Sequence, residues 1–257
     1  MPRNSPLFSI SNLVKTFSPG KGTTVSALSG VNMEIREGEL LLIAGANGSG
    51  KTVLMLILAG LMDPDEGELL FRGQPLGGAI GELRRHLGLV FQDPDAQTVG
   101  ETVAEDIAFG PKNLGLSKPA VMERVQNALE ALGLEHKRDW PPRNLSGGEK
   151  RRLAVAGVLA MGCGTIIMDE PFANLDWPGV VQVLEIIRQL KNEGKTVILL
   201  THELEKVLAF ADRLIILDRG IIREDGKPAD VLDRLKDSYG VRDPRRNYGA
   251  VEDCTWL

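Results

Sequence analysis

Several features that would place a chain in a specialised class of protein are scarce or missing here. Cysteine occurs twice, as Cys163 and Cys254, which is too few for a disulfide framework and suggests a reducing compartment. No stretch reaches the roughly eighteen apolar residues that a membrane-spanning helix needs. The N-terminal sequence MPRNSP lacks the apolar core of a signal peptide. We therefore expect a cytosolic protein, which would reach a membrane only through a partner.

An excess of positive charge is also missing. The 257 residues include 30 Lys and Arg against 35 Asp and Glu, for a formal net charge of −5. General nucleic-acid binders are usually strongly basic, so that class is disfavoured. No internal repeat or low-complexity linker is visible, and the three histidines and two cysteines show no metal-ligand spacing. The length suits one large domain or two closely joined lobes.

The glycine-rich sequence GANGSGKT at residues 45–52 is the most informative stretch of the chain. It fits the phosphate-binding pattern Gly, four residues, Gly-Lys-Thr. A buried strand is expected over 39–44 and a helix over 53–59, so that backbone N–H groups converge on one anion. Glycines let the backbone approach a phosphate closely. The expected phosphate-site residues are Gly45, Ala46, Asn47, Gly48, Ser49, Gly50, Lys51, which contacts the β- and γ-phosphates, and Thr52, which ligates Mg²⁺.

The segment before this loop predicts a small antiparallel sheet. Short strands are expected over 7–10, 13–17, 24–28 and 31–35, with a turn over 18–22. Phe17 ends one of these strands. Its ring can stack on an adenine or be one more core aromatic, and its position alone favours the core.

Beyond the loop, the pattern changes from strands to helices. We expect a strand and a loop over 68–78, a short polar helix or turn over 82–86, and a buried strand over 88–91 that delivers Gln92. The Gln92 amide can hold a metal or a water, or it can cap a loop. From residue 93 to about 150 the apolar spacing is helical, which predicts a helical lobe inserted into an α/β core.

A second glycine-containing turn opens the helix that follows this lobe. Ser146 is a good N-cap and Glu149 stands three residues later, as in a capping box. Capping explains these two residues. It does not explain Gly147 and Gly148, which cost helix stability, whereas close approach of an anion does.

Two later strands end in polar residues. Strand 165–168 precedes Asp169 and Glu170, and strand 195–200 precedes Thr201 and His202. Asp169 can ligate Mg²⁺, and Glu170 can orient and polarise an attacking water. Because ligands bind at the carboxyl ends of parallel strands, His202 is a candidate functional residue. His86 and His136 have no such placement and are expected on the surface, and further elements are expected at 178–192, 213–217, 221–224 and 228–235.

Taken together, these stretches resemble the motifs of the ATP-binding cassette (ABC) ATPases, over about residues 7–235. Six motifs occur in the family's order: Walker A at 45–52, the Q-loop at Gln92, the signature at 145–149, Walker B at 166–170, the D-loop at 174–176 and the switch histidine at His202. The resemblance also aligns Phe17 with the adenine-stacking aromatic, which reverses the preference for a core role. Two residues depart from the commonest pattern. Glu149 replaces a frequent Gln, and Asn174 replaces a frequent Gly, where Asn tolerates left-handed geometry.

This resemblance implies the fold and the reaction. The implied fold is α/β, a P-loop NTPase core with a mainly parallel sheet, a small antiparallel β-subdomain and an inserted helical subdomain. One domain would span 1–257, with the core at 7–92 and 161–235, the helical subdomain at about 93–160, and a tail at 236–257 that has no assigned role. ATP and Mg²⁺ are the implied substrate and metal, with Gln92 near the metal alongside Thr52 and Asp169, and Glu170, His202 and Gln92 in the catalytic set. In the implied head-to-tail dimer, residues Ser146, Gly147, Gly148 and Glu149 act on ATP held by the other chain, and Asp176 lies at the dimer contact.

Two segments, 90–97 and 106–116, carry a narrower resemblance to the ATPase subunit of energy-coupling factor importers. It implies two partners besides a second ATPase chain, a transmembrane coupling subunit and a substrate-binding membrane subunit. The helical lobe would receive the coupling helices on the cytoplasmic face of the membrane. The implied cargo is a transition-metal ion (cobalt or nickel) or a vitamin, and no nucleic acid is involved.

Two other functions remain to be weighed. A soluble cassette ATPase acting on nucleic acid or the ribosome usually has two cassettes or a long coiled coil, and this chain has one cassette, no heptad run and a negative charge. A regulatory module that binds ATP without hydrolysis conflicts with the intact Asp169, Glu170 and His202.

Overall fold

A computed structural model describes residues 6–20 and 23–245. Residues 1–5, 21–22 and 246–257 fall outside it, and with them Cys254, most of the N-terminal sequence discussed above and the end of the 236–257 tail. The strands are β1 (Pro6–Gly20), β2 (Thr23–Arg36), β3 (Leu40–Ala44), β4 (Glu66–Phe71), β5 (Gln74–Pro75), β6 (Leu87–Val90), β7 (Thr165–Asp169), β8 (Thr196–Leu200), β9 (Arg213–Asp218) and β10 (Ile221–Gly226). The α-helices are α1 (Lys51–Leu58), α2 (Leu76–His86), α3 (Val103–Asn113), α4 (Lys118–Ala131), α5 (Gly147–Met161), α6 (Trp177–Asn192), α7 (Leu204–Val207) and α8 (Pro228–Asp233).

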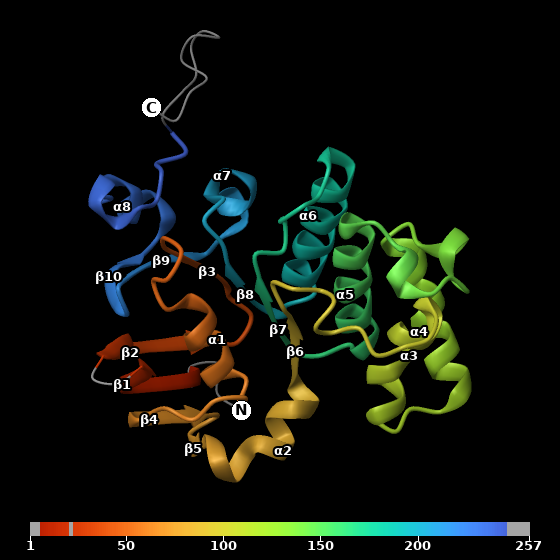
Figure 1. The fold of residues 1–257 in the computed structure, drawn as a ribbon, viewed down its shortest axis with the longest axis horizontal. Coiled ribbons are helices and arrows are strands. Elements are labelled where there is room, and N and C mark those ends of the chain that lie inside the picture. The colour runs from red at the N-terminus through yellow and green to blue at the C-terminus, as the bar shows by residue number, and fades with distance from the viewer. Residues whose placement is uncertain (1–5, 21–22, 246–257) are drawn as a thin grey trace, which may run out of the picture.

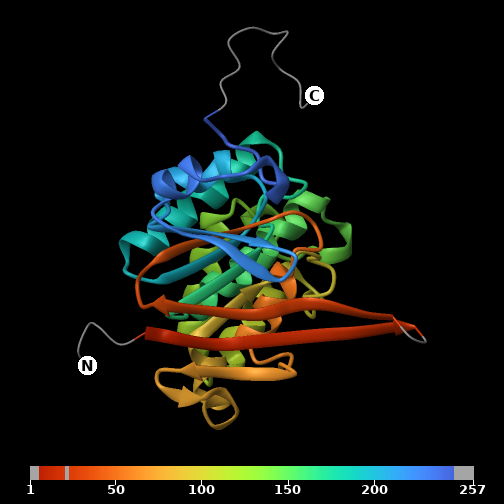
Figure 2. The same cartoon turned by 90° about the vertical axis from the view of Figure 1, so that its left-hand side faces the viewer.

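These strands form two sheets. The larger sheet has the order β10-β9-β3-β8-β7-β6, in which β9 to β6 run parallel and β10 is antiparallel to β9. The smaller sheet has the order β2-β1-β4-β5 and is antiparallel. Figure 2 shows β1 and β2 as a long ribbon below the larger sheet. The expected α/β fold with a mainly parallel sheet and a small antiparallel sheet is confirmed.

The larger sheet is covered on both faces, which is why its central strands are apolar throughout. In β3, Leu41 and Ile43 face the cluster shared with the antiparallel sheet and α1, and Leu40 and Leu42 face the cluster shared with α5 and α6. All five residues of β3 are buried. Parallel sheets with two covered faces show this continuous apolar pattern.

Helices α3, α4 and α5 pack against one another and form the right-hand part of the molecule in Figure 1. Thr102 caps α3 by accepting a hydrogen bond from the Glu105 N–H. The side chains of Val121, Val125 and Leu129 on α4 are buried in the main apolar cluster. Among the residues that the structure describes, no helix combines the length and apolarity needed to cross a membrane.

Several local expectations were wrong. The four short strands are two long ones, because register shifts absorb the irregular positions. Strand β1 includes residues 18–20 of the expected turn, and the remaining two, 21–22, lie outside the described residues. Helix α2 starts at Leu76, ahead of the expected 82–86, although it contains three glycines. His86 is half-buried against the Phe71 ring, with the ring centroids 5.8 Å apart, instead of lying free on the surface.

Candidate active site

Four neighbouring strands deliver the candidate residues to one edge of the larger sheet. The order β3-β8-β7-β6 means that residues 45–52, His202, Asp169 with Glu170, and Gln92 follow adjacent parallel strands at their carboxyl ends. Asp169 pairs in register with Leu200, so Glu170 lies beside Thr201. Residues that are far apart in the sequence therefore meet at the edge where ligands of open α/β sheets bind.

A cavity of about 380 Å³ opens at this edge, a volume within the range of nucleotide-sized pockets. It is bounded by the phosphate loop on one side and by β1 and β2 on the other. The lining residues are Phe17, Val25, Ser26, Ala27, Asn47, Gly48, Ser49, Gly50, Lys51, Thr52, Val53, Gln92, Asp169 and Glu170.

The three glycines of the loop have different reasons to be glycine. A Cβ at Gly45 would lie 2.1 Å from the carbonyl oxygen of Leu217, and one at Gly50 would lie 2.4 Å from that of Ala27. Gly48 has a φ of +79° and no atom within 4 Å of an added Cβ. Close approach to a phosphate was the expected reason for all three. At Gly48 no contact within the chain competes with this reason, whereas packing inside the chain by itself requires glycine at Gly45 and Gly50.

Alanine substitutions should separate these two roles. We expect Gly45→Ala to lower the free energy of unfolding by about 3 kcal/mol, because the new methyl group meets a backbone oxygen. Gly48→Ala should cost only about 1 kcal/mol, because it meets left-handed strain without a clash. Urea denaturation of both variants measures the difference, and equal losses at the two positions would contradict the packing role of Gly45.

The charged and hydroxyl groups of the loop fit a phosphate. Lys51 is buried and its Nζ donates to the carbonyl oxygens of Gly45 at 2.7 Å and Ala46 at 3.2 Å. Burial lowers the pKa of Lys51, while Glu170 and Asp169 act in the opposite direction. The Ser49 hydroxyl is buried and has no hydrogen-bond partner among the described residues. An anion in the cavity would give the Ser49 hydroxyl a hydrogen-bond partner and the Lys51 ammonium an opposite charge.

Asp169 and Thr52 form the expected oxygen pair. The Thr52 hydroxyl donates to Asp169 Oδ2 at 2.8 Å, and Asp169 is 1% exposed. Burial raises the pKa of Asp169, and the neighbouring Glu170 carboxylate acts in the same direction. A hydroxyl and a carboxylate side by side are ligands that Mg²⁺ prefers, and a divalent cation would offset the buried negative charge. The residues present therefore fit a magnesium ion.

Glu170 is held in an unusual conformation. Its φ is +47°, a left-handed value that a non-glycine residue adopts at an energetic cost. The Thr201 hydroxyl donates to Glu170 Oε2 at 3.1 Å, and His202 Nδ1 lies 2.8 Å from Oε1. The carboxylate is thus aimed by two residues at the end of β8.

Phe17 and Gln92 line the same cavity. Phe17 is 39% exposed, so the core role predicted from its position in the sequence alone is wrong. Gln92 follows β6, and its side chain is exposed at the cavity. Neither residue is packed away, so both are available to a ligand.

The signature turn lies outside this cavity. Ser146 and Glu149 form the expected capping box at the start of α5, and the Lys137 ammonium pairs with Glu149 at 2.5 Å. An added Cβ at Gly147 would meet no atom within 4 Å, and one at Gly148 would approach Asn174 O only to 3.4 Å. Packing within the chain therefore leaves open space at Gly147 and admits a methyl group at Gly148, so it does not require glycine at either position.

The D-loop lies beside this turn. Asn174 has a φ of +62°, the left-handed geometry expected to be tolerable for Asn. Asp176 Oδ1 accepts from the Gly179 N–H at 3.0 Å and so caps α6 within the chain. The structure therefore brings together the phosphate loop, Asp169, Glu170, His202, Phe17 and Gln92, and leaves 146–149 and Asp176 outside the cavity of their own chain.

Two residues with clear contacts at the site escaped the sequence reasoning. Thr201 is fully buried, and its hydroxyl also accepts from the Glu203 N–H at 3.0 Å. Arg151 is 2% exposed on α5. The only signal for either was a polar residue next to an apolar run, a pattern too common to carry a prediction.

Comparison with known proteins identifies the family. A family model described as ABC transporter matches residues 28–173. This chain belongs to the ABC transporter family. The cassette is 43% identical over 238 residues, 93% of this chain and 100% of the relative, to a putative ABC transporter ATP-binding protein of Halobacterium salinarum. It is 42% identical over 214 residues, 82% of this chain and 76% of the relative, to the energy-coupling factor transporter ATP-binding protein EcfA of Methanocaldococcus jannaschii.

Solved structures of other cassettes share the fold. CbiO1 of Clostridium perfringens, described as part of the ABC transporter complex cbiONQ, superposes with a TM-score of 0.76 at 35% identity, over 90% of this chain and 92% of that protein. A dimeric post-hydrolysis state of the ATP-binding cassette MJ0796 with ADP and Pi gives a TM-score of 0.78 at 28% identity, over 86% and 98% of the two chains. This ABC cassette binds ATP and is an ATP hydrolase, so the purely regulatory alternative is wrong.

Proposed function

We propose that this ABC ATPase is the ATP-hydrolysing subunit of an energy-coupling factor importer. The observation that carries the proposal is an apolar groove of about 480 Å³ beside the nucleotide cavity. Both segments that resemble the importer ATPases, 90–97 and 106–116, contribute residues to its wall. Relatives named energy-coupling factor ATP-binding proteins support the same assignment.

The groove suits an apolar helix of a membrane subunit. It lies between β6, α3 and α5, and its wall includes Leu61, Leu89, Phe91, Val99, Phe109 and Leu153. Leu61, Val99 and Phe109 are each at least half exposed, at 55%, 59% and 50%. Exposed apolar side chains around a concave surface mark a binding site for an amphipathic helix. The helix would come from the transmembrane coupling subunit, which places the ATPase on the cytoplasmic face of the membrane.

In the proposed reaction, two cassettes share each ATP. The phosphate loop of one chain binds the triphosphate, and Ser146, Gly147 and Gly148 of the second chain supply backbone N–H groups at a helix N-terminus. Phe17 stacks on the adenine, and Asp176 contacts the second chain. Packing within the chain does not require glycine at either signature position, which supports close approach of that phosphate as the reason for both.

Hydrolysis then depends on groups already in place in this chain. Glu170 accepts a proton from the attacking water, and His202 contacts the γ-phosphate while it orients the carboxylate. Thr52, Asp169 and Gln92 would hold Mg²⁺, which neutralises charge that develops on the phosphate oxygens. Loss of the γ-phosphate removes the group that joins the two chains, so the cassettes separate and move the membrane subunit.

The cargo is a transition-metal ion (cobalt or nickel) or a vitamin, bound by a separate substrate-binding membrane subunit. The alternative, a soluble ATPase acting on nucleic acid or the ribosome, is not favoured, because the relatives reported above carry transporter names. Identification of the membrane proteins encoded by the neighbouring reading frames would name the cargo class.

A charge in the groove should break the contact with the membrane subunit. We expect Phe109→Asp to abolish stimulation of ATP turnover by those membrane proteins in reconstituted vesicles, because burying an unpaired carboxylate costs several kcal/mol. Basal turnover of the isolated ATPase should stay within about twofold. Met122→Asp is the matched control, since Met122 is 55% exposed on α4 and does not line the groove. If the membrane proteins stimulate ATP turnover of Phe109→Asp as strongly as that of the parent, the groove is not their docking site.

A further inference from the structure

A buried arginine lies between the nucleotide cavity and the groove. Arg151, in the first turns of α5, is 2% exposed and ranks among the largest fully buried side chains that the structure describes. Its Nη1 donates to the carbonyl oxygen of Phe91 at 2.7 Å, and its Nη2 donates to that of Gln92 at 2.5 Å. Both contacts cross from the helical lobe to the end of β6.

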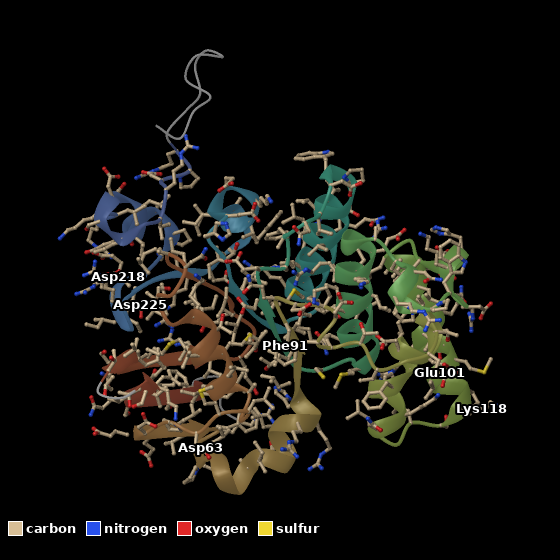
Figure 3. The ribbon with its side chains drawn as sticks, in the orientation of Figure 1. Asp63, Phe91, Glu101, Lys118, Asp218 and Asp225 are labelled. Carbon is tan, nitrogen blue, oxygen red and sulfur yellow. The ribbon has the colours of Figure 1, made fainter. Side chains whose placement is uncertain are left out.

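The two acceptor residues belong to different cavities. Phe91 lines the groove, and Gln92 lines the nucleotide cavity. Figure 3 labels Phe91 at the end of β6, between the β-rich part of the molecule and helices α3–α5. The Arg151 guanidinium therefore binds the carbonyl oxygens of two consecutive residues, one in the wall of each cavity.

Burying this charge has a cost that the surroundings repay only in part. Burial lowers the pKa of Arg151, while the carboxylates of Asp169, Asp93 and Glu170 favour its charged form. The Nε atom is buried and has no hydrogen-bond partner among the described residues. An apolar residue would fill a core position without this penalty, so stability alone does not account for an arginine here.

Other contacts hold the same segment in place. Lys150 Nζ lies 2.7 Å from Asp95 Oδ1, and the Gln97 side chain donates to Leu89 O at 2.9 Å. It also accepts from the Phe91 N–H at 3.2 Å. Lys150 and Gln97 thus hold segment 89–97 in place. Arg151 adds the buried contacts, which reach both the residue that lines the groove and the residue that lines the nucleotide cavity.

We propose that Arg151 is a positioning residue, which fixes the Phe91–Gln92 backbone so that a displacement on the groove side moves Gln92 on the nucleotide side. An arginine suits this task because its planar fork can hold two carbonyl oxygens at fixed spacing, whereas a lysine ammonium is a single point donor. The inference rests on the proposed function only for the identity of the groove's occupant. The positioning of Gln92 by Arg151 does not depend on that occupant and can be measured in the isolated ATPase.

The test is a double-mutant cycle on basal ATP turnover, with Arg151→Lys, Arg151→Gln, Gln92→Ala and each combination. We expect Arg151→Lys to lower kcat about tenfold and to leave KM for ATP within about twofold, because Gln92 loses its position and the phosphate loop does not. In the Gln92→Ala background, Arg151→Lys should have no further effect on kcat. Arg84→Lys on the exposed face of α2 is the matched control and should match the parent.

The same cycle separates positioning from simple stabilisation. Additive losses of kcat in the double variant would overturn the proposal, because Arg151 would then act independently of Gln92. Should Arg151→Gln fail to fold, Arg151→Lys decides, since it keeps the buried charge. Failure of both variants to fold would also overturn it, because the arginine would then be a structural residue.

A second measurement separates this proposal from the proposed function. If the membrane subunits stimulate the parent ATPase, Arg151→Lys should lose most of that stimulation. If they do not stimulate the parent, the proposed function fails, while the non-additive kcat with Gln92 still stands. If stimulation of Arg151→Lys equals that of the parent, the coupling role is refuted.

Discussion

Glu170→Gln is expected to bind ATP with an affinity within about threefold of the parent and to lose turnover by about 10²- to 10³-fold. The amide has the size of the carboxylate but cannot accept a proton from water. The Glu170 carboxylate is 5% exposed and is oriented by Thr201 and His202. Bulk water therefore cannot replace it as the proton acceptor in the variant. Steady-state phosphate release and equilibrium ATP binding measure the two effects.

The control for this variant is Glu193→Gln, at an exposed position after α6, which should match the parent in both measurements. The ATP-loaded Glu170→Gln protein should also accumulate as a dimer in gel filtration, because bound nucleotide is no longer consumed. Full turnover would remove the assigned role of Glu170. A monomer at high concentration, with the membrane subunits present, would contradict the shared nucleotide.

Two inactive chains should restore activity when they are mixed. Lys51→Ala removes the buried ammonium of the phosphate loop, and Gly148→Asp puts a carboxylate where the signature would meet a phosphate of the second chain. Each variant alone should retain less than about 1% of parental turnover. A mixed head-to-tail dimer contains one pocket built from two intact halves, so an equimolar mixture should recover about a quarter of parental turnover.

This result depends on the shared pocket and not on folding. In the described chain, the signature turn does not line the nucleotide cavity, and in the proposed arrangement a second chain supplies it there. Mixtures of Lys51→Ala with Glu170→Gln are the control, because Glu170→Gln carries an intact signature but lacks the catalytic carboxylate beside its own phosphate loop. An inactive Lys51→Ala and Gly148→Asp mixture in which cross-linked dimers form would contradict the arrangement.

Much of the site could be predicted because its motifs are local. The loop at residues 45–52 combines a strand end, left-handed glycines and a helix start within one short segment, and the Ser146–Glu149 capping box spans four residues. Such features depend on backbone geometry and on side chains that neighbour each other in the sequence. The alternation of polar ends with apolar strands likewise predicted that several polar residues share one edge of the sheet.

The sequence by itself thus determined the phosphate loop, the capped signature helix, the acidic strand end and the family to which they belong. The tertiary structure decided which distant residues support them. Thr201 meets Glu170 across 31 residues and Arg151 meets Phe91 across 60, while Gly45 packs on a carbonyl of β9. These contacts depend on strand order and on helix packing, which bring together residues with no periodic relation in the chain. For that reason, the candidate residues of the nucleotide cavity could be named from the sequence, and Thr201 and Arg151, which contact them from distant segments, could not.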